Sequence, residues 1–198
     1  MAETDSRQGK EALRSRYRRL RDETDRDSCA RSSVALSRNL SRVQALDAMD
    51  IIAGYVSFRN EIDIGPYLET RLEANRAVCL PRVQGDHLEF VQVHDLHSLV
   101  PGAFGILEPV GEPFPVAEIE VFLVPGLVFD HDGARLGFGK GYYDRVLCSR
   151  SGHRPLAIGV CYAWQLIDSP IPVEPHDVSM DLIATDEGIF SSSDRVKI

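Results

Sequence analysis

The chain has 198 residues, of which 43% are hydrophobic and 26% charged, and its formal net charge at pH 7 is -8. These proportions are typical of a globular protein and exclude a largely disordered chain. The length suits a single domain spanning residues 1–198. Because nonspecific binding to nucleic acid needs a basic surface, the negative charge argues against DNA or RNA as a partner.

The first predicted element is a helix over residues 6–23. Its spacing places Leu13, Tyr17 and Leu20 on one face. A basic stripe lies beside that face and consists of Lys10, Arg14, Arg18 and Arg21. We expect the apolar face to pack against the protein, and Arg18 and Arg21 to lie at the surface.

Helices and short strands alternate along the rest of the chain. Thr24 or Asp25 is a candidate cap for a second helix running to Leu46, and Asp63 is a candidate cap for a helix through Leu72. Another helix is predicted over residues 142–149. Short apolar runs predict strands at residues 51–56, 77–80 (closed by Pro81), 88–93, 120–124, 156–161 and 182–185. Continuously apolar runs are typical of buried parallel strands, so the pattern indicates an α/β sandwich with a largely parallel sheet.

The cysteines and the N-terminal residues bear on the cellular compartment. Cys29, Cys79, Cys148 and Cys161 are widely spaced and form no C-x-x-C pair, as expected for reduced thiols. The first residues lack the apolar segment of a secretory signal, and no apolar run approaches the ~20 residues of a membrane-spanning helix. We therefore expect a cytoplasmic protein without a membrane partner.

The most distinctive segment is the glycine-rich run from Arg135 to Asp144. Glycine recurs at every second position, which fits neither the P-loop nor the Rossmann fingerprint. Glycines permit positive φ angles and let backbone N–H groups approach an anion, as does the start of the following helix. Arg135 and Lys140 could stabilise a transferring phosphoryl group, and Asp144 could hold Mg²⁺. The glycines alone are better explained by a hairpin with a solvated lysine, but the added charged residues favour a phosphate site.

This segment also resembles a known family. Arg135-Leu136-Gly137-Phe138-Gly139-Lys140-Gly141-Tyr142-Tyr143-Asp144 is similar to the signature of the 5-formyltetrahydrofolate cyclo-ligases, also called 5,10-methenyltetrahydrofolate synthetases. Weaker matches follow in the family's order: Lys10-x-x-Leu13-Arg14, Glu61-Ile62-Asp63, Leu80-Pro81-Arg82, Gly105-Ile106-Leu107-Glu108-Pro109 and Pro172-Val173-x-x-His176-Asp177. The resemblance spans about residues 10–187.

The resemblance implies both a fold and a reaction. The fold would be a three-layer α/β sandwich with a largely parallel central sheet, of the NagB/RpiA/CoA-transferase type. The reaction would convert 5-formyltetrahydrofolate into 5,10-methenyltetrahydrofolate with ATP and Mg²⁺, releasing ADP and phosphate. We expect a monomer whose partners are these two substrates.

The resemblance also implies an ATP site that joins the first helix to the glycine-rich segment. The catalytic residues would be Lys140, Arg135 and Tyr143. The implied ATP-binding residues are Lys10, Arg14, Arg135, Leu136, Gly137, Phe138, Gly139, Lys140, Gly141, Tyr142 and Tyr143. From the residues alone, a solvated basic helix face is the better explanation of Lys10 and Arg14, and the resemblance reverses that preference.

A folate site and a metal site are implied beside it. The implied folate-binding residues are Val56, Phe58, Glu61, Phe104, Phe138, Gly139, Lys140, Gly141 and Tyr142. Glu61 could accept paired N–H bonds from a pterin edge, although it is also placed to cap the next helix. Phe58 and Phe104 fit a core role about as well as a ring-binding one. The implied Mg²⁺ ligands are Asp144 and Asp177, of which Asp177 alone would be typical of a cap or turn.

Several other residues suggest sites less strongly. His94-x-x-His97 has metal-like spacing but lacks a third ligand, so we expect solvated histidines. Asp132 precedes a glycine and predicts a turn. Trp164 and Gln165 border the site without a clear role.

Other functional classes remain open. The same scaffold could serve as a noncatalytic folate- or nucleotide-binding module, because fold does not fix function. An ATP-dependent ligase could act on another N-formyl compound. Nucleic-acid binding through the basic first helix conflicts with the net charge. The residues that together favour the cyclo-ligase are Lys10, Arg14, Glu61, Lys140, Asp144 and Asp177.

Overall fold

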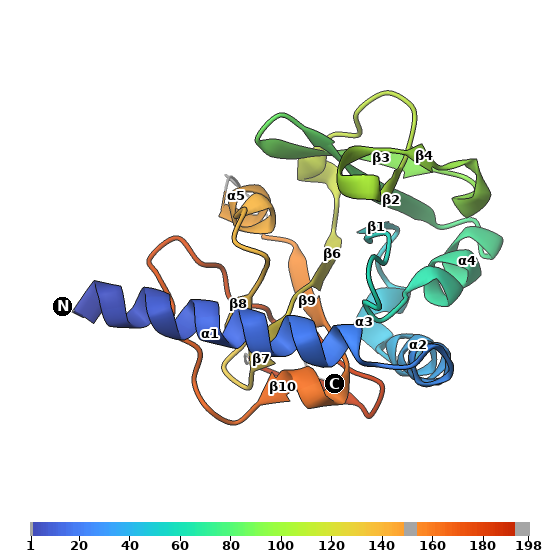
Figure 1. Ribbon diagram of the computed structural model, residues 1–198. Coiled ribbons are helices and arrows are strands. Elements are labelled where there is room, and N and C mark those ends of the chain that lie inside the picture. The colour runs from blue at the N-terminus through green and yellow to red at the C-terminus, as the bar shows by residue number, and fades with distance from the viewer. Residues whose placement is uncertain (1, 149–153, 193–198) are drawn as a thin grey trace.

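The computed structural model describes residues 2–148 and 154–192 and is built on a seven-stranded sheet (Figure 1). The strands lie in the order β12 (Ile189–Ser191), β11 (Leu182–Ala184), β9 (Leu156–Val160), β6 (Val121–Pro125), β1 (Ile51–Ala53), β2 (Ala77–Gln84) and β3 (His87–Val93). Neighbouring strands from β11 to β2 are parallel, and only the edge strands β12 and β3 are antiparallel. The prediction of a largely parallel sheet is confirmed.

Helices cover both faces of this sheet. Alternate strand residues such as Leu123 and Ile158 pack with Leu36 and Leu68 of the helices α2 (Arg26–Leu40) and α4 (Gly65–Glu73). The short helix α3 (Gln44–Asp47) adds to the same layer. On the other face, Phe122 packs in the cluster that contains residues of α5 (Tyr142–Cys148). A strand that is apolar at every position is therefore buried on both sides, as expected for a central parallel strand.

The N-terminal helix α1 (Ala2–Asp22) lies outside these layers, across a second, three-stranded sheet (Figure 1). The strands of this sheet are β10 (Leu166–Ile167), β7 (Val128–Asp130) and β8 (Arg135–Leu136). Tyr17 is buried against Leu127 and Leu136, with Leu13 and Leu20 at the rim. The predicted apolar stripe of the helix is thus the face that packs.

The remaining elements are short. Residues Val100–Pro101 (β4) and Leu107–Glu108 (β5) form a two-stranded ribbon, and single 3₁₀ turns cover Leu96–Ser98, Ala103–Gly105, Val116–Glu118 and Ala163–Gln165. Within residues 2–148 and 154–192, no helix is long and apolar enough to cross a membrane.

Three predicted boundaries are wrong. The second helix does not run to Leu46, because the chain turns after Leu40 and restarts at Gln44, which brings Val43 and Leu46 into the same core. The strand β2 continues through Pro81, which is tolerated because β1 pairs only with residues 77–79 and leaves that side of β2 open. The first strand ends at Ala53, so residues 54–56 leave the sheet.

The helix starts follow the predicted side chains more closely. Asp25, rather than Thr24, caps α2 by accepting a hydrogen bond from the backbone N–H of Ser28. The N-cap of α4 is Ile64 rather than the predicted Asp63, although Asp63, one residue earlier, still accepts a hydrogen bond from the N–H of Gly65.

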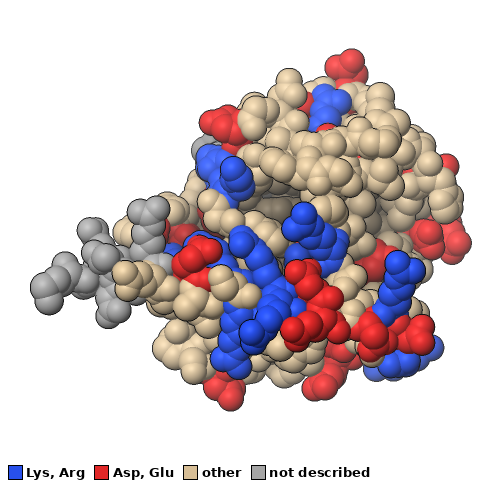
Figure 2. All heavy atoms as spheres, in the orientation of Figure 1, with Lys and Arg blue, Asp and Glu red and all other residues tan. Residues whose placement is uncertain are grey.

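The strand order creates a crevice at the carboxyl ends of the central strands β1 and β6. From β1 the chain proceeds to β2 on one side, whereas from β6 it proceeds to β9 and β11 on the other. In open α/β sheets, ligands bind outside the carboxyl ends of the strands at such a point. Figure 2 shows a hollow on this face of the molecule, with lysine and arginine side chains gathered around it.

Candidate active site

The glycine-rich segment, residues 137–141, forms a loop between β8 and α5. Gly139 has a φ of 91° and Gly141 a φ of 65°, which is a backbone that L side chains rarely adopt. An open pocket of about 320 Å³ borders this loop. Its lining residues are Gly139, Lys140, Gly141, Asp144, Arg145, Cys148 and His176. The loop therefore has the form that the spacing predicts, and it borders a pocket large enough for a phosphate group.

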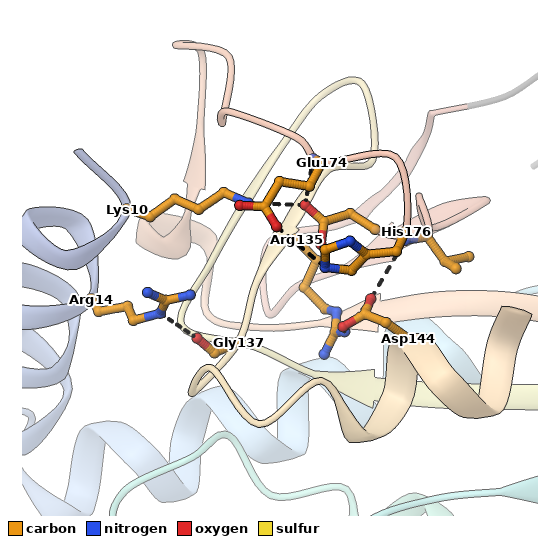
Figure 3. A network of polar contacts seen from close by, with 9 residues as sticks. Lys10, Arg14, Arg135, Gly137, Asp144, Glu174 and His176 are labelled. Atoms are coloured by element: carbon orange, nitrogen blue, oxygen red, sulfur yellow. Dashed lines mark hydrogen bonds and ion pairs between the residues drawn. The ribbon is translucent and has the colours of Figure 1, made fainter. Parts of the chain in front are cut away.

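The helix α1 contacts this loop from across the crevice. The Nε atom of Arg14 donates to the carbonyl oxygen of Gly137 at 3.1 Å (Figure 3). The guanidinium groups of Arg18 and Arg21 lie 5.7 and 5.0 Å from the centre of the Phe138 ring. Two segments more than a hundred residues apart in the sequence are thus brought together, as the implied ATP site requires.

Lys10 is buried and paired with carboxylates of the C-terminal segment. Its Nζ atom lies 3.0 Å from Oδ2 of Asp177 and 3.3 Å from Oε1 of Glu174 (Figure 3). Burial acts to raise the pKa of Asp177, but the N–H of Glu174 and the Lys10 ammonium outweigh it and hold the pKa below the usual aspartate value. Asp177 is therefore an ionised carboxylate at neutral pH.

Arg135 and Asp144 form a second pair close by. The Nη2 atom of Arg135 lies 2.9 Å from both carboxylate oxygens of Asp144. The guanidinium also lies 5.6 Å from the centre of the Tyr143 ring. The backbone N–H of Val178 donates to Asp144 at 3.4 Å, which places the segment containing Asp177 beside this pair. The two predicted metal ligands thus lie on adjoining segments, each bonded to a predicted phosphate-binding cation.

The residues around Asp177 suit a divalent cation. Ligand atoms of Glu174, His176 and Asp177 all lie within 4.8 Å of one another. Carboxylate oxygens are the ligands that Mg²⁺ prefers, and the side chains of Asp144 and Asp177 are 19% and 22% exposed, so solvent reaches both. Sequence reasoning missed Glu174 and His176, although their spacing beside Asp177 was a usable signal.

Glu61 lies on the opposite side of the crevice, in the segment that follows β1. Its Oε1 atom accepts a hydrogen bond from Nη1 of Arg21 at 3.1 Å, and its Oε2 atom accepts one from the N–H of Phe58 at 3.0 Å. Glu61 therefore does not cap the next helix. The expectation that Arg21 lies at the surface is wrong, because its side chain is 1% exposed and neutralises this carboxylate.

Burial controls the ionisation of Glu61. It raises the pKa of the carboxyl above the usual glutamate value, and Arg21 and the Phe58 N–H offset part of that rise. Because the folded protein holds the proton more tightly than the unfolded chain, the contribution of this group to stability falls as the pH rises through the raised pKa. Such a penalty is typical of a carboxylate retained for binding rather than for folding.

The predicted ring-binding residues differ in their surroundings. Val56 and Phe58 are partly buried and precede Glu61 by a few residues in the chain. The guanidinium of Arg59 lies 5.0 Å from the centre of the Phe58 ring. Phe104 lies in a 3₁₀ turn with a φ of 57°, and its side chain is 63% exposed. A core role for Phe104 is therefore excluded.

The two tyrosines that follow the loop are partly buried at the start of α5. Burial and the nearby Glu61 raise the pKa of Tyr143 well above the usual tyrosine value, while Arg135 lowers it. Tyr143 is therefore a neutral phenol that can donate a hydrogen bond but cannot act as a base near neutral pH. Tyr142 lies beneath the guanidinium of Arg145, at 5.3 Å.

Three further residues near the site, Trp164, Gln165 and Asp130, have structural roles. Trp164 lies between Tyr17 and Tyr162, with ring centres 6.1 and 5.4 Å away and rings nearly parallel, so it holds α1 against the body of the protein. Gln165 is buried and donates to the carbonyl oxygens of Gly126 and Leu127. Asp130 is likewise buried and accepts from three backbone N–H groups. His94 and His97, which have metal-like spacing in the sequence, do not belong to the group of possible metal ligands found among the described residues.

The chain is similar to known proteins over nearly its whole length. Residues 6–186 match the 5-formyltetrahydrofolate cyclo-ligase family. The chain is 32% identical to the 5-formyltetrahydrofolate cyclo-ligase of Saccharomyces cerevisiae, covering 90% of this chain and 96% of that protein. It is 30% identical to that of Escherichia coli, covering 70% of this chain and 79% of the relative.

Solved structures give the same result. The 5,10-methenyltetrahydrofolate synthetase of Aquifex aeolicus superimposes with a TM-score of 0.83 at 31% identity, covering 96% of this chain and 95% of the other. That of Mycoplasma pneumoniae superimposes with a TM-score of 0.73 at 27% identity, covering 89% and 98%. The chain belongs to the 5-formyltetrahydrofolate cyclo-ligase family.

Proposed function

We propose that the protein converts 5-formyltetrahydrofolate into 5,10-methenyltetrahydrofolate with consumption of ATP. The observation that carries the proposal is that two segments with different chemistry face each other across one crevice, and we call them its two walls. One wall is the glycine loop, with Lys140 and Arg14 beside its backbone, and suits a phosphate chain. The other carries Glu61, whose carboxylate suits the N–H groups of a pterin.

The chemistry needs no protein nucleophile. The formyl oxygen attacks the γ-phosphorus of ATP, and ADP leaves. N10 of the folate then attacks the formyl carbon, a C–N bond forms, the C–O bond breaks, and phosphate leaves with the former formyl oxygen while N10 loses its proton. Positioning of the two substrates and stabilisation of the developing charge supply the catalysis.

Three residues of the loop wall have distinct parts in this proposal. Lys140 is exposed beside the pocket and, within the described residues, forms no ion pair, so its ammonium is available to the transferring phosphoryl group. Arg135, which is paired with Asp144 beside the loop, would stabilise the same charge. The phenol of Tyr143 donates a hydrogen bond rather than accepting a proton. Lys10, Arg14 and the backbone from residue 136 to 143 bind the rest of the ATP.

Asp144 and Asp177 would hold Mg²⁺, since both are hard oxygen donors that solvent reaches. The ion supplies neutralisation of charge on the phosphates. In the protein alone these carboxylates bond to Arg135 and Lys10. When ATP binds with Mg²⁺, Arg135 and Lys10 would turn to phosphate and Asp144 and Asp177 would hold the ion, so that no buried charge would be left unpaired.

The folate would lie against the segment after β1. Glu61 orients the pterin, and Val56, Phe58 and Tyr142 contribute apolar or aromatic walls, with the loop residues 138–141 on the other side. The exposed Phe104 would stack on the ligand once it is bound, because a large apolar side chain gains most from covering another apolar surface. We further propose that residues 1–198 act as one monomeric catalytic domain in the cytoplasm.

An absorbance assay tests the proposal. The protein should form 5,10-methenyltetrahydrofolate, detected in the near ultraviolet, only when 5-formyltetrahydrofolate, ATP and Mg²⁺ are all present. Tight folate binding without product would instead indicate a noncatalytic module. Turnover of ATP with a different N-formyl compound, but not with this folate, would indicate a ligase of other specificity.

A further inference from the structure

Arg21 is the most deeply buried charged residue at the crevice. It lies in the last turn of α1, and its side chain is 1% exposed. Its guanidinium donates to Glu61 and lies 5.0 Å from the centre of the Phe138 ring. It therefore contacts one residue from each wall of the crevice.

A second buried arginine bonds to a different kind of acceptor. Arg71, in α4, donates to the backbone carbonyl oxygens of Leu46, Met49 and Asp50, which fastens the turn after α3. Arg21 instead donates to a carboxylate. The Nε atoms of both arginines are buried without a hydrogen-bond partner among the described residues, so the difference between them lies in the acceptor. Arg71 bonds to backbone oxygens, which holds the fold, whereas Arg21 fixes the direction of a carboxylate at the crevice.

Glu61 has remaining capacity for a ligand. Each of its oxygens accepts one hydrogen bond, from Arg21 or from Phe58. Because a carboxylate has about four acceptor positions, one position on each oxygen is left without a donor from residues 2–148 and 154–192. The two donors that are present fix the plane of the carboxylate and hence the direction of the free positions.

We propose that Arg21 is a positioning residue that orients the ionised carboxylate of Glu61 toward the folate and ties it to Phe138 of the glycine loop. The inference rests on the proposed function, which supplies the folate. It deepens that function by giving the last turn of α1 a part in folate binding, besides the ATP-binding part of Lys10 and Arg14 in the preceding turns.

The charged surroundings of Glu61 make the effect of Arg21 measurable. The groups that face this carboxylate are Arg21 from α1, Tyr55 from the segment after β1, and Tyr143 from α5. Both tyrosines are neutral near pH 7 because burial raises the pKa of each. Arg21 is thus the only cation of this set, and its removal shifts the ionisation of Glu61 to higher pH.

The test compares Arg21→Met with Arg19→Met, which removes an exposed arginine from the same helix. For Arg21→Met we expect the KM for 5-formyltetrahydrofolate to rise by about tenfold or more, as for loss of a hydrogen bond to a charged group, with the KM for ATP changing by less than about threefold. The acidic limb of kcat/KM for the folate should move to higher pH. Arg19→Met should change neither quantity.

Conservative variants separate positioning from packing. Arg21→Lys should return the acidic limb toward its wild-type position, whereas Arg21→Gln, which keeps a donor but not the charge, should not. If Arg21→Met does not fold, Arg21→Gln gives the same comparison. A folded neutral variant with wild-type folate KM and an unshifted acidic limb would overturn the inference.

The outcome is distinguishable from failure of the proposed function. If the wild-type protein forms no product, the proposed reaction is wrong. Folate affinity, followed through the fluorescence of Trp164, the single tryptophan of the chain, then gives the same comparison of variants without turnover. Equal affinities of wild type and Arg21→Met would again contradict the role of Arg21.

Discussion

The two walls of the crevice hold their charged groups in different ways. On the loop wall, Arg135 and Lys10 pair with Asp144 and Asp177, two carboxylates that solvent reaches. On the opposite wall, Arg21 pairs with Glu61, and the side chains are only 1% and 10% exposed. Breaking any of these pairs without a replacement partner leaves a buried cation uncompensated. On the loop wall, however, the carboxylates are open to a ligand, whereas on the opposite wall the carboxylate is buried as well.

This difference matches the charges that each substrate would bring to the site. A nucleotide with its metal ion brings both signs of charge, so the loop wall can pair with itself while the site is empty and with the ligand when it is bound. A pterin edge brings neutral donors, so the opposite wall needs one carboxylate held ionised in a fixed direction. We therefore expect the loop wall to rearrange on ligand binding and the wall of Glu61 to be preorganised.

The largest effect is expected at the one loop cation without an ion pair among the described residues. Lys140→Ala should lower kcat/KM by about 10²- to 10³-fold, as for loss of one group that stabilises transition-state charge. Since Lys140 is exposed, the melting temperature of the Lys140→Ala variant should stay close to that of the wild type. His97→Ala is the control and should keep full activity. If Lys140→Ala is as active as His97→Ala, the lysine takes no part in the reaction.

The next effect tests whether Asp177 holds the metal ion. Asp177→Asn should raise the Mg²⁺ concentration for half-maximal rate by about tenfold or more, because a carboxylate ligand becomes a neutral one. The matched control is Asp168→Asn, which removes an exposed carboxylate paired with His131. An unchanged Mg²⁺ requirement in Asp177→Asn would show that Asp177 serves only to pair with Lys10.

A glycine substitution tests the shape of the loop. Gly139→Ala forces a φ of 91° on an alanine, a strain of about 1–2 kcal/mol, and should raise the KM for ATP by up to about tenfold. Gly85→Ala, in the β2–β3 hairpin, imposes a similar strain at a φ of 61° and has open space around the added methyl group. It should lower stability by about 1 kcal/mol and leave the KM unchanged. Equal KM values for the two variants would contradict a role for the loop backbone in ATP binding.

The smallest effect is a change of chemical labelling. Cys148 is exposed and lines the pocket beside the loop, whereas Cys79 and Cys161 are buried, and burial raises the pKa of the Cys79 thiol to about 12. Iodoacetamide should therefore label Cys148 before the buried cysteines, as peptide mass spectrometry would show. ATP with Mg²⁺ should slow that labelling. Labelling at an unchanged rate would place the nucleotide away from this pocket.

The sequence predicted the parts of the molecule that depend on local pattern. Continuous apolar runs such as residues 120–124 indicated central strands, and the alternating glycines indicated the loop, because both signals lie within a few consecutive residues. The positive φ angles of Gly139 and Gly141 agree with that loop prediction. Thr24 and Asp25 were both candidate caps of the second helix, and the hydrogen bond from the N–H of Ser28 shows that Asp25 is the cap.

The parts that the sequence did not predict depend on tertiary contacts. Arg21 looked like another member of a basic stripe, and only the approach of Glu61, forty residues later in the chain, shows that it is buried. Pro81 looked like the end of a strand because local rules cannot tell that β1 leaves one side of β2 open. The tie between Trp164 and Tyr17 likewise needs α1 to fold back across the second sheet.

The most direct test of the account follows one oxygen atom. The protein is supplied with 5-formyltetrahydrofolate carrying ¹⁸O in the formyl group, together with ATP and Mg²⁺, and the released phosphate is analysed by mass spectrometry. If the two walls bring the formyl oxygen to the γ-phosphorus, each molecule of methenyl product should be accompanied by one ADP and one ¹⁸O-labelled phosphate. Methenyl product with unlabelled phosphate would contradict transfer of the phosphoryl group to the folate at this site.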